Sequence, residues 1–141
     1  MGEERPNVGQ QFKGIIGHSL LSESLDNLTA LRNIIKPHAD KVFSDPLASD
    51  KEILDHPAVK AHNQLFFAHT HMEAALKEHD SGTGNGKKDA ILSHMSLMNG
   101  LKAAANIPGI EEHYPNIIGY FQNINENMTK LANLNEEGPL K

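Results

Sequence analysis

Apolar residues recur at intervals of three and four along most of the chain, which is the spacing of an amphipathic α-helix. No segment sustains the alternation of period two that predicts a β-strand. The pattern therefore predicts an all-α, single-domain helical bundle with four main helices and shorter ones between them. We expect the bundle to occupy residues 12–134, between a flexible arm over 1–11 and a frayed tail over 135–141.

The predicted breaks between helices follow proline, glycine and capping residues. A first, leucine-rich helix is expected to stop or bend at Lys36, because a proline follows it. Ser49 and Glu52 have the spacing of a capping box, and they predict a short helix that ends or kinks before Pro57. The glycine-rich segment 80–86 predicts a loop between the two central helices.

The central helix, predicted over residues 57–78, carries a stripe in which polar groups interrupt apolar ones. Two imidazoles, His62 and His69, and the carboxylate Glu73 share this stripe. Burying such groups without partners costs about 1–3 kcal/mol each, so we expect them to bind each other, water, a metal or a cofactor. The whole stripe comprises Val59, His62, Phe66, His69, Glu73 and Leu76.

Two later helices complete the expected bundle. The first, over residues 88–99, is expected to turn its large apolar residues inward, with His94 at the border of that face. The second is expected to start near Ile110 or Pro115 and to present a continuous apolar stripe. The inward residues of the first are Ile91, Leu92, Met95 and Met98, and the stripe of the second comprises Tyr114, Ile117, Ile118, Phe121, Ile124, Met128 and Leu131.

Composition narrows the chemistry. The absence of cysteine excludes disulfides, thiol catalysis and iron–sulfur clusters, while nine histidines keep imidazole ligation open. A net charge of -5 with both signs mixed along the chain, and no basic patch, argues against a nucleic-acid partner. The chain has neither an apolar run of about 20 residues nor a secretory signal, so we expect no membrane association and a cytoplasmic location.

The spacing of the histidines leaves several interpretations open. They are either surface groups hydrogen-bonded to neighbours, or ligands of a transition metal in a helical bundle. His69 and Glu73 lie four residues apart on one helix face, as two ligands of one ion would, and His62 or His94 could complete the set. The Glu-x-x-His pairs of di-metal bundles are absent. Phosphotransfer through His69 is a further alternative.

One stretch of the chain resembles the globin family. The string 57–62, which ends in His62, looks like the start of the globin distal helix, whose distal histidine faces the bound gas. Phe43 stands at nearly the family's separation from that histidine and matches the phenylalanine that wedges the haem. Pro37 matches the proline that opens the preceding short helix, and Phe66 falls on another distal-pocket position.

The resemblance covers residues 28–121 and includes 109–114, which are similar to the start of the helix after the proximal side. It implies a globin-like protein that binds haem and dioxygen or another small gaseous ligand. Matching from the distal side makes His94 the proximal iron ligand, and His62 would donate a hydrogen bond to the gas. Matching from residue 113 instead points to 102–104, where no histidine stands. The implied pocket walls are Phe43, Phe66, Leu97 and Met98.

A different class of function needs no cofactor. Amphipathic helices without a complete catalytic set are typical of an interaction or adaptor module that binds a protein partner. No serine lies in a Gly-x-Ser-x-Gly motif, and no sheet is predicted to hold one, so we do not expect an enzyme. The signature of such a module is an exposed apolar patch or groove.

Overall fold

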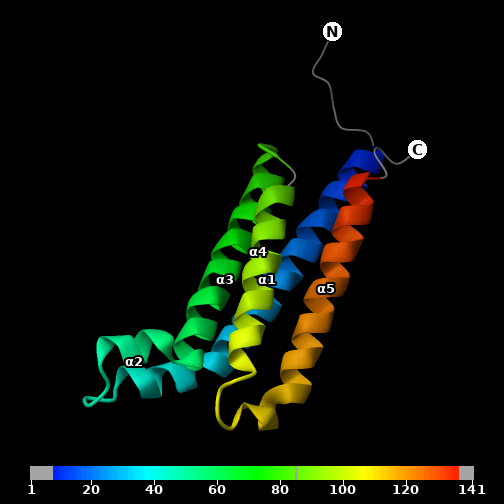
Figure 1. Cartoon of the computed structure of the whole chain (residues 1–141). Helices are drawn as coiled ribbons and strands as arrows, with labels where there is room; N and C mark the ends of the chain where they lie inside the picture. Colours follow the sequence, from blue (N-terminus) through cyan, green and yellow to red (C-terminus); the bar gives the residue numbers. More distant parts are fainter. Residues whose placement is uncertain (1–7, 85, 137–141) are drawn as a thin grey trace.

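Figure 1 shows the computed structural model of the chain, which describes residues 8–84 and 86–136. The expectation of an all-α fold with four main helices and shorter ones is confirmed, and these residues contain no strand. The elements are α1 (Val8–Phe43), α2 (Asp50–Asp55), α3 (Pro57–Ser81), α4 (Lys87–Ala104), the 3-10 helix η1 (Ile110–His113) and α5 (Tyr114–Glu136).

The four long helices run alternately down and up, as in an antiparallel bundle (Figure 1). α3 packs extensively on both α1 and α4, and α5 packs on α1. α4 and α5 face each other across the remaining side, with few direct contacts between their backbones. One side of the bundle is therefore closed less tightly than the other three.

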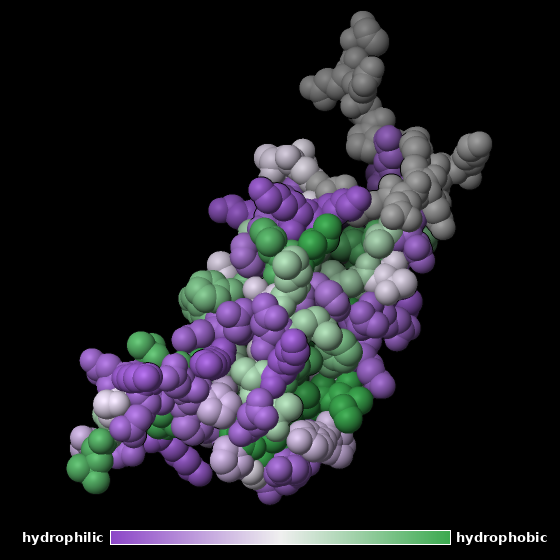
Figure 2. All heavy atoms as spheres, in the orientation of Figure 1, coloured by the Kyte–Doolittle hydropathy of each residue, from purple (hydrophilic) through white to green (hydrophobic). Residues whose placement is uncertain are grey.

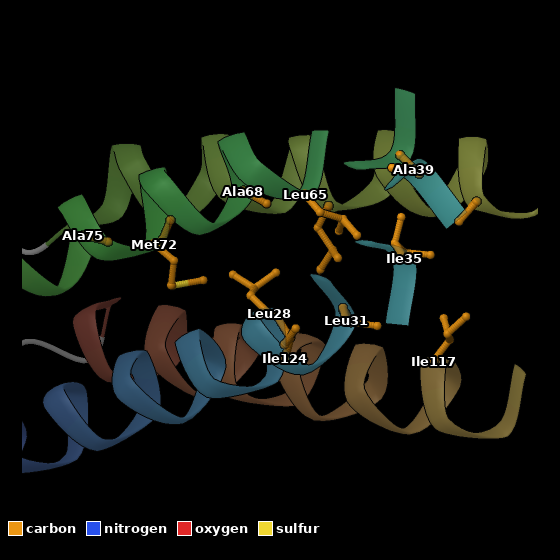
Figure 3. Close-up of a cluster of buried hydrophobic side chains, with 14 of the residues drawn as sticks. Leu28, Leu31, Ile35, Ala39, Leu65, Ala68, Met72, Ala75, Ile117 and Ile124 are labelled. Atoms are coloured by element: carbon orange, nitrogen blue, oxygen red, sulfur yellow. The ribbon is translucent and has the colours of Figure 1, made fainter. Parts of the chain in front are cut away.

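The core lies where α1, α3 and α5 meet (Figure 3). Leu28 and Leu31 of α1 point towards Leu65 and Met72 of α3, and Ile124 of α5 packs beside them (Figure 3). All five side chains are buried. Burying each side chain of this size contributes about 1.5–3 kcal/mol, which makes this cluster the main source of stability.

Small residues let α3 and α4 approach closely. Ser93 of α4 donates a hydrogen bond of 2.6 Å to the backbone oxygen of Ala68, which is possible only at short interhelical distance. At Gly86, which precedes α4, φ is +75° and a Cβ would lie 2.6 Å from the backbone oxygen of Ala75. Glycine is therefore required at this turn, both for its conformation and for space.

α1 differs from the sequence-based expectation at both of its ends. It begins at Val8 rather than at Phe12, so the expected arm over residues 1–11 overlaps the helix, and residues 1–7 lie outside the described part. It also continues through Pro37 to Phe43, so of the two expected outcomes at Lys36, a stop or a bend, the stop is wrong. Burial of residues on both sides of the exposed proline offsets the backbone hydrogen bond that proline cannot make.

The remaining boundaries agree closely with the capping signals. The Ser49 hydroxyl accepts a 3.2 Å hydrogen bond from the backbone of Glu52, and α2 ends before Pro57 opens α3. The helix expected over residues 88–99 is longer in the structure, because α4 continues through Gly100 to Ala104. α5 extends to residue 136, so part of the tail expected to fray is helical, and residues 137–141 lie outside the described part.

None of the described helices has the length and apolar character needed to cross a membrane.

Candidate functional site

The stripe of α3 that was expected to be buried lies mainly at the border between the buried and the exposed faces of the helix. Val59 is buried as expected, but Phe66 is 48% exposed and Glu73 is exposed. The face that enters the core is instead lined by small and aliphatic residues, which let α1 and α4 pack closely against α3. That face comprises Ala58, Ala61, Leu65, Ala68, Met72 and Ala75.

His69 and Glu73 contact each other, which is one of the alternatives that the sequence left open for them. The His69 Nδ1 atom lies 2.8 Å from a carboxylate oxygen of Glu73, and its Nε2 atom lies 3.1 Å from the Thr29 hydroxyl of α1. Both ring nitrogens thus have protein partners. Among the described residues, no three histidine or acidic side chains come close enough together to hold a metal ion.

His62 lies at the edge between α3 and α1. Its ring meets Phe43 edge to face, with 6.4 Å between centroids. Burial, followed by the nearby Arg32 guanidinium, holds the pKa of His62 below its usual value. The Nδ1 atom of His62 and the Nε atom of Arg32 are buried without a hydrogen-bond partner, while the guanidinium lies 5.4 Å from the Phe66 ring centre.

His94 contacts a different part of the bundle. Its ring stacks on Phe121 of α5, with 6.5 Å between centroids and 27° between planes. Its Nδ1 atom is buried and has no hydrogen-bond partner. The globin resemblance places His62 and His94 on either side of a haem. In the structure His62 contacts Phe43 of α1, whereas His94 contacts Phe121 of α5, so the two histidines face different helices.

Three of the four large apolar residues of α4 that were expected to face inward point outward, while Leu92 is partly buried. Ile91, Met95 and Met98 are 51%, 56% and 45% exposed, although Leu97 is buried in the core. The inward face of α4 is built from smaller side chains instead. That face comprises Ala90, Ser93, Leu97, Gly100 and Ala104.

Two of these outward side chains, Ile91 and Met95, line an apolar pocket between α4 and α5, which we call the α4–α5 groove. Its cavity volume is about 420 Å³, and it lies where α4 begins and α5 ends. Figure 2 shows hydrophobic residues gathered along this side of the molecule. The groove is lined by Lys87, Ala90, Ile91, His94 and Met95 of α4 and by Asn125, Met128, Thr129, Leu131, Ala132 and Asn133 of α5.

The apolar surface continues beyond the groove along α5. Ile118 is exposed, and Phe121 and Met128 are only partly buried. With the residues of α4, they form two parallel apolar lines that no other described element covers. An exposed, contiguous apolar surface of this kind marks an interaction or ligand site more often than a surface that only faces water.

α4 is also the most basic of the described helices. It carries Lys87, Lys88 and Lys102, against the single carboxylate Asp89. Asp89 is turned towards α3, where its oxygen lies 3.0 Å from His71, and this contact lowers the pKa of Asp89. Lys88 and Lys102 each lie one heptad from Met95, so the exposed apolar line has a lysine at both ends.

The sequence carries a signal for this groove. Small residues at 90, 93, 100 and 104 repeat with helical spacing around Leu97, and such a stripe is typical of closely packed helices. Large apolar residues that fall off that stripe, such as Ile91 and Met95, are the ones left outside. Hydrophobicity alone predicts the wrong buried face for α4, because the size of the side chains decides which face packs against α3.

Comparison with known proteins assigns the chain to no family. No family model matches the chain, and no match is found among curated proteins or solved structures. Fold and site together define the class: an antiparallel helical bundle with an apolar groove on its least closed side.

Proposed function

We propose that this protein is a cofactor-free interaction module whose α4–α5 groove receives an amphipathic helix. The observation that carries the proposal is the exposed line Ile91, Met95 and Met98 beside an apolar pocket. Helices that dock in grooves do so through apolar residues spaced by three and four, which this surface complements. Methionine suits such a surface, because its flexible side chain adapts to the shape of a partner.

The lysines on the exposed line of α4 favour an acidic partner. Lys88 and Lys102 stand about 21 Å apart along α4, at 1.5 Å per residue, with Met95 between them. A helix of about four turns with acidic residues near both ends would place its charges opposite these lysines. Electrostatic complementarity of this kind raises the association rate and selects between partners.

A synthetic amphipathic peptide of leucine and glutamate, labelled with a fluorophore, tests the proposal by anisotropy titration of the full chain. We expect saturable binding, which Met95→Glu weakens about tenfold or more because it places a charge in the apolar contact. Ile15→Glu is the matched control, since Ile15 is also exposed but lies on α1. Absence of saturable binding, or equal losses in both variants, would contradict the proposal.

His94 favours a second candidate, which is the haem protein implied by the globin resemblance. Its ring lies among apolar side chains in the groove, as a haem-ligating imidazole does. Ile91, Met95, Met128 and Leu131 would then contact the porphyrin. Haem would supply the iron that binds dioxygen or another small gas. The unpartnered Nδ1 atom of His94 argues against haem ligation, because ligating histidines are usually oriented by a hydrogen bond.

Titration of the purified chain with hemin separates the two candidates. A sharp Soret band that shifts on reduction and carbon monoxide binding would support haem ligation, provided that His94→Ala abolishes it and His18→Ala does not. His18 is the control because it lies on α1 and is paired with Asp80. Hemin association without a defined ligation spectrum, or an unchanged band in His94→Ala, would exclude this candidate.

A further inference from the structure

The segment between α1 and α3 stands away from the bundle. We call residues 43–55, from the end of α1 to the end of α2, the acidic arm. Figure 1 shows α2 projecting to one side of the four long helices. α2 contains no buried residue, and its principal contacts are with α3.

The acidic arm combines exposed apolar side chains with negative charge. Leu47 is 90% exposed and Leu54 is 63% exposed, which are high values for leucine. Around them lie four carboxylates and one lysine, so the arm carries a net charge of -3. The charged residues are Asp45, Asp50, Lys51, Glu52 and Asp55. An acidic segment with exposed leucines has the chemistry that the α4–α5 groove complements.

The arm and the groove of one chain are too far apart to meet. The arm lies where α1 ends and α3 begins, whereas the groove lies where α3 has ended and α4 begins. α3 spans 25 residues, or about 37 Å at 1.5 Å per residue. The groove follows α4 back by about 12 Å, to Met95, so about 25 Å of helix still separates this residue from the arm. A contact between them therefore requires two molecules.

We propose that the α4–α5 groove of one copy of this chain binds the acidic arm of a second copy. This inference rests on the proposed docking function of the groove and names its partner. Leu47 and Leu54 enter the groove beside Met95. The arm's carboxylates face Lys88, because the six-residue α2 spans only about 9 Å and cannot also reach Lys102. Pairing two α4 faces with each other is less favourable, because an antiparallel arrangement would set Lys88 of one copy against Lys102 of the other.

Complementation between two variants tests the contact directly. Met95→Glu damages the groove and leaves the arm intact, whereas Leu54→Lys damages the arm and leaves the groove intact. Both positions are exposed, so both variants should fold, as circular dichroism will verify. We expect the wild-type chain to self-associate in sedimentation velocity, each variant alone to do so at least tenfold more weakly, and their mixture to form a complex.

Salt and a control variant sharpen the result. Complex formation should weaken as ionic strength rises, because the contact joins opposite charges. Ile15→Glu, which alters an exposed apolar residue outside both surfaces, should associate as the wild type does. The proposal is overturned if the wild type stays monomeric from about 1 µM to 1 mM, if the variant mixture forms no complex, or if Ile15→Glu also abolishes association.

The outcomes distinguish this inference from the proposed function. If the leucine–glutamate peptide binds the groove while the chain stays monomeric, the groove is a docking site for another partner and only the inference fails. If the peptide does not bind and the variants do not complement each other, both fail together.

Discussion

Single residues on this bundle show how position sets chemistry. His62 lies between α3 and α1, and burial and then Arg32 hold its pKa below the usual value. Asp40 acts in the opposite direction and Lys36 in the same one. The neutral imidazole is thus the form that the folded state prefers.

This preference makes stability depend on pH. The unfolded chain binds a proton at His62 more readily than the folded chain, so the free energy of unfolding should fall as pH drops below about 6.5 and through the folded-state pKa. Burial and then His113 lower the pKa of His38, which adds to the same trend. Urea unfolding of the wild type and His62→Gln at about pH 7.5 and pH 5 measures the effect.

We expect His62→Gln to lose less stability than the wild type over this range, because glutamine cannot titrate. Equal losses in the two proteins would show that His62 does not contribute to the pH dependence.

Individual helices carry the next level of organisation. α1 is a single helix of 36 residues despite Pro37, which lacks the backbone N–H that would bond to residue 33. Pro57 occupies the opposite situation, at the first turn of α3, where its fixed φ suits the start of a helix. The same residue type is therefore expected to have opposite effects at the two positions.

Replacing each proline by alanine tests this expectation. Pro37→Ala should raise the free energy of unfolding, by up to about 3 kcal/mol, because it restores a helical hydrogen bond at an exposed site. Pro57→Ala should lower it by about 0.4–1 kcal/mol, because the unfolded chain gains freedom. Chemical denaturation measures both changes in the free energy of unfolding. A loss of stability in Pro37→Ala would mean that the proline shapes a bend in α1 that the acidic arm requires.

The whole molecule is held together unevenly. α3 packs on two long helices, while α5 packs mainly on α1 and only sparsely on α4. Local opening is easiest where packing contacts are fewest. The side of the bundle that bears the groove should therefore open before the side formed by α1, α3 and α4.

Native-state hydrogen exchange measures this asymmetry. Backbone amides at the centre of α5, around Ile124, should exchange roughly tenfold faster or more than those around Leu65 and Met72 of α3. Protein concentrations low enough to keep the chain monomeric are needed, so that docking does not protect α5. Equal protection of the two helices would mean that the bundle opens as one cooperative unit.

Sequence pattern was a good guide to local structure, since local structure depends on neighbouring residues. Helical periodicity predicted the all-α fold, Ser49 and Glu52 predicted the start of α2, and Pro57 marked the start of α3. The contact of His69 with Glu73 was among the alternatives that their spacing along one helix left open. These features depend on residues only a few positions apart.

Only the tertiary structure decided which helix faces were buried and which remained outside. The edge position of Phe66 and the exposed line of Ile91 and Met95 depend on how closely α3 and α4 approach. That distance is set by alanines on α3 and by alanine, serine and glycine on α4, whose small size outweighs the hydrophobicity of larger residues nearby. The sequence determined the helices, and the packing of small side chains between them determined the groove.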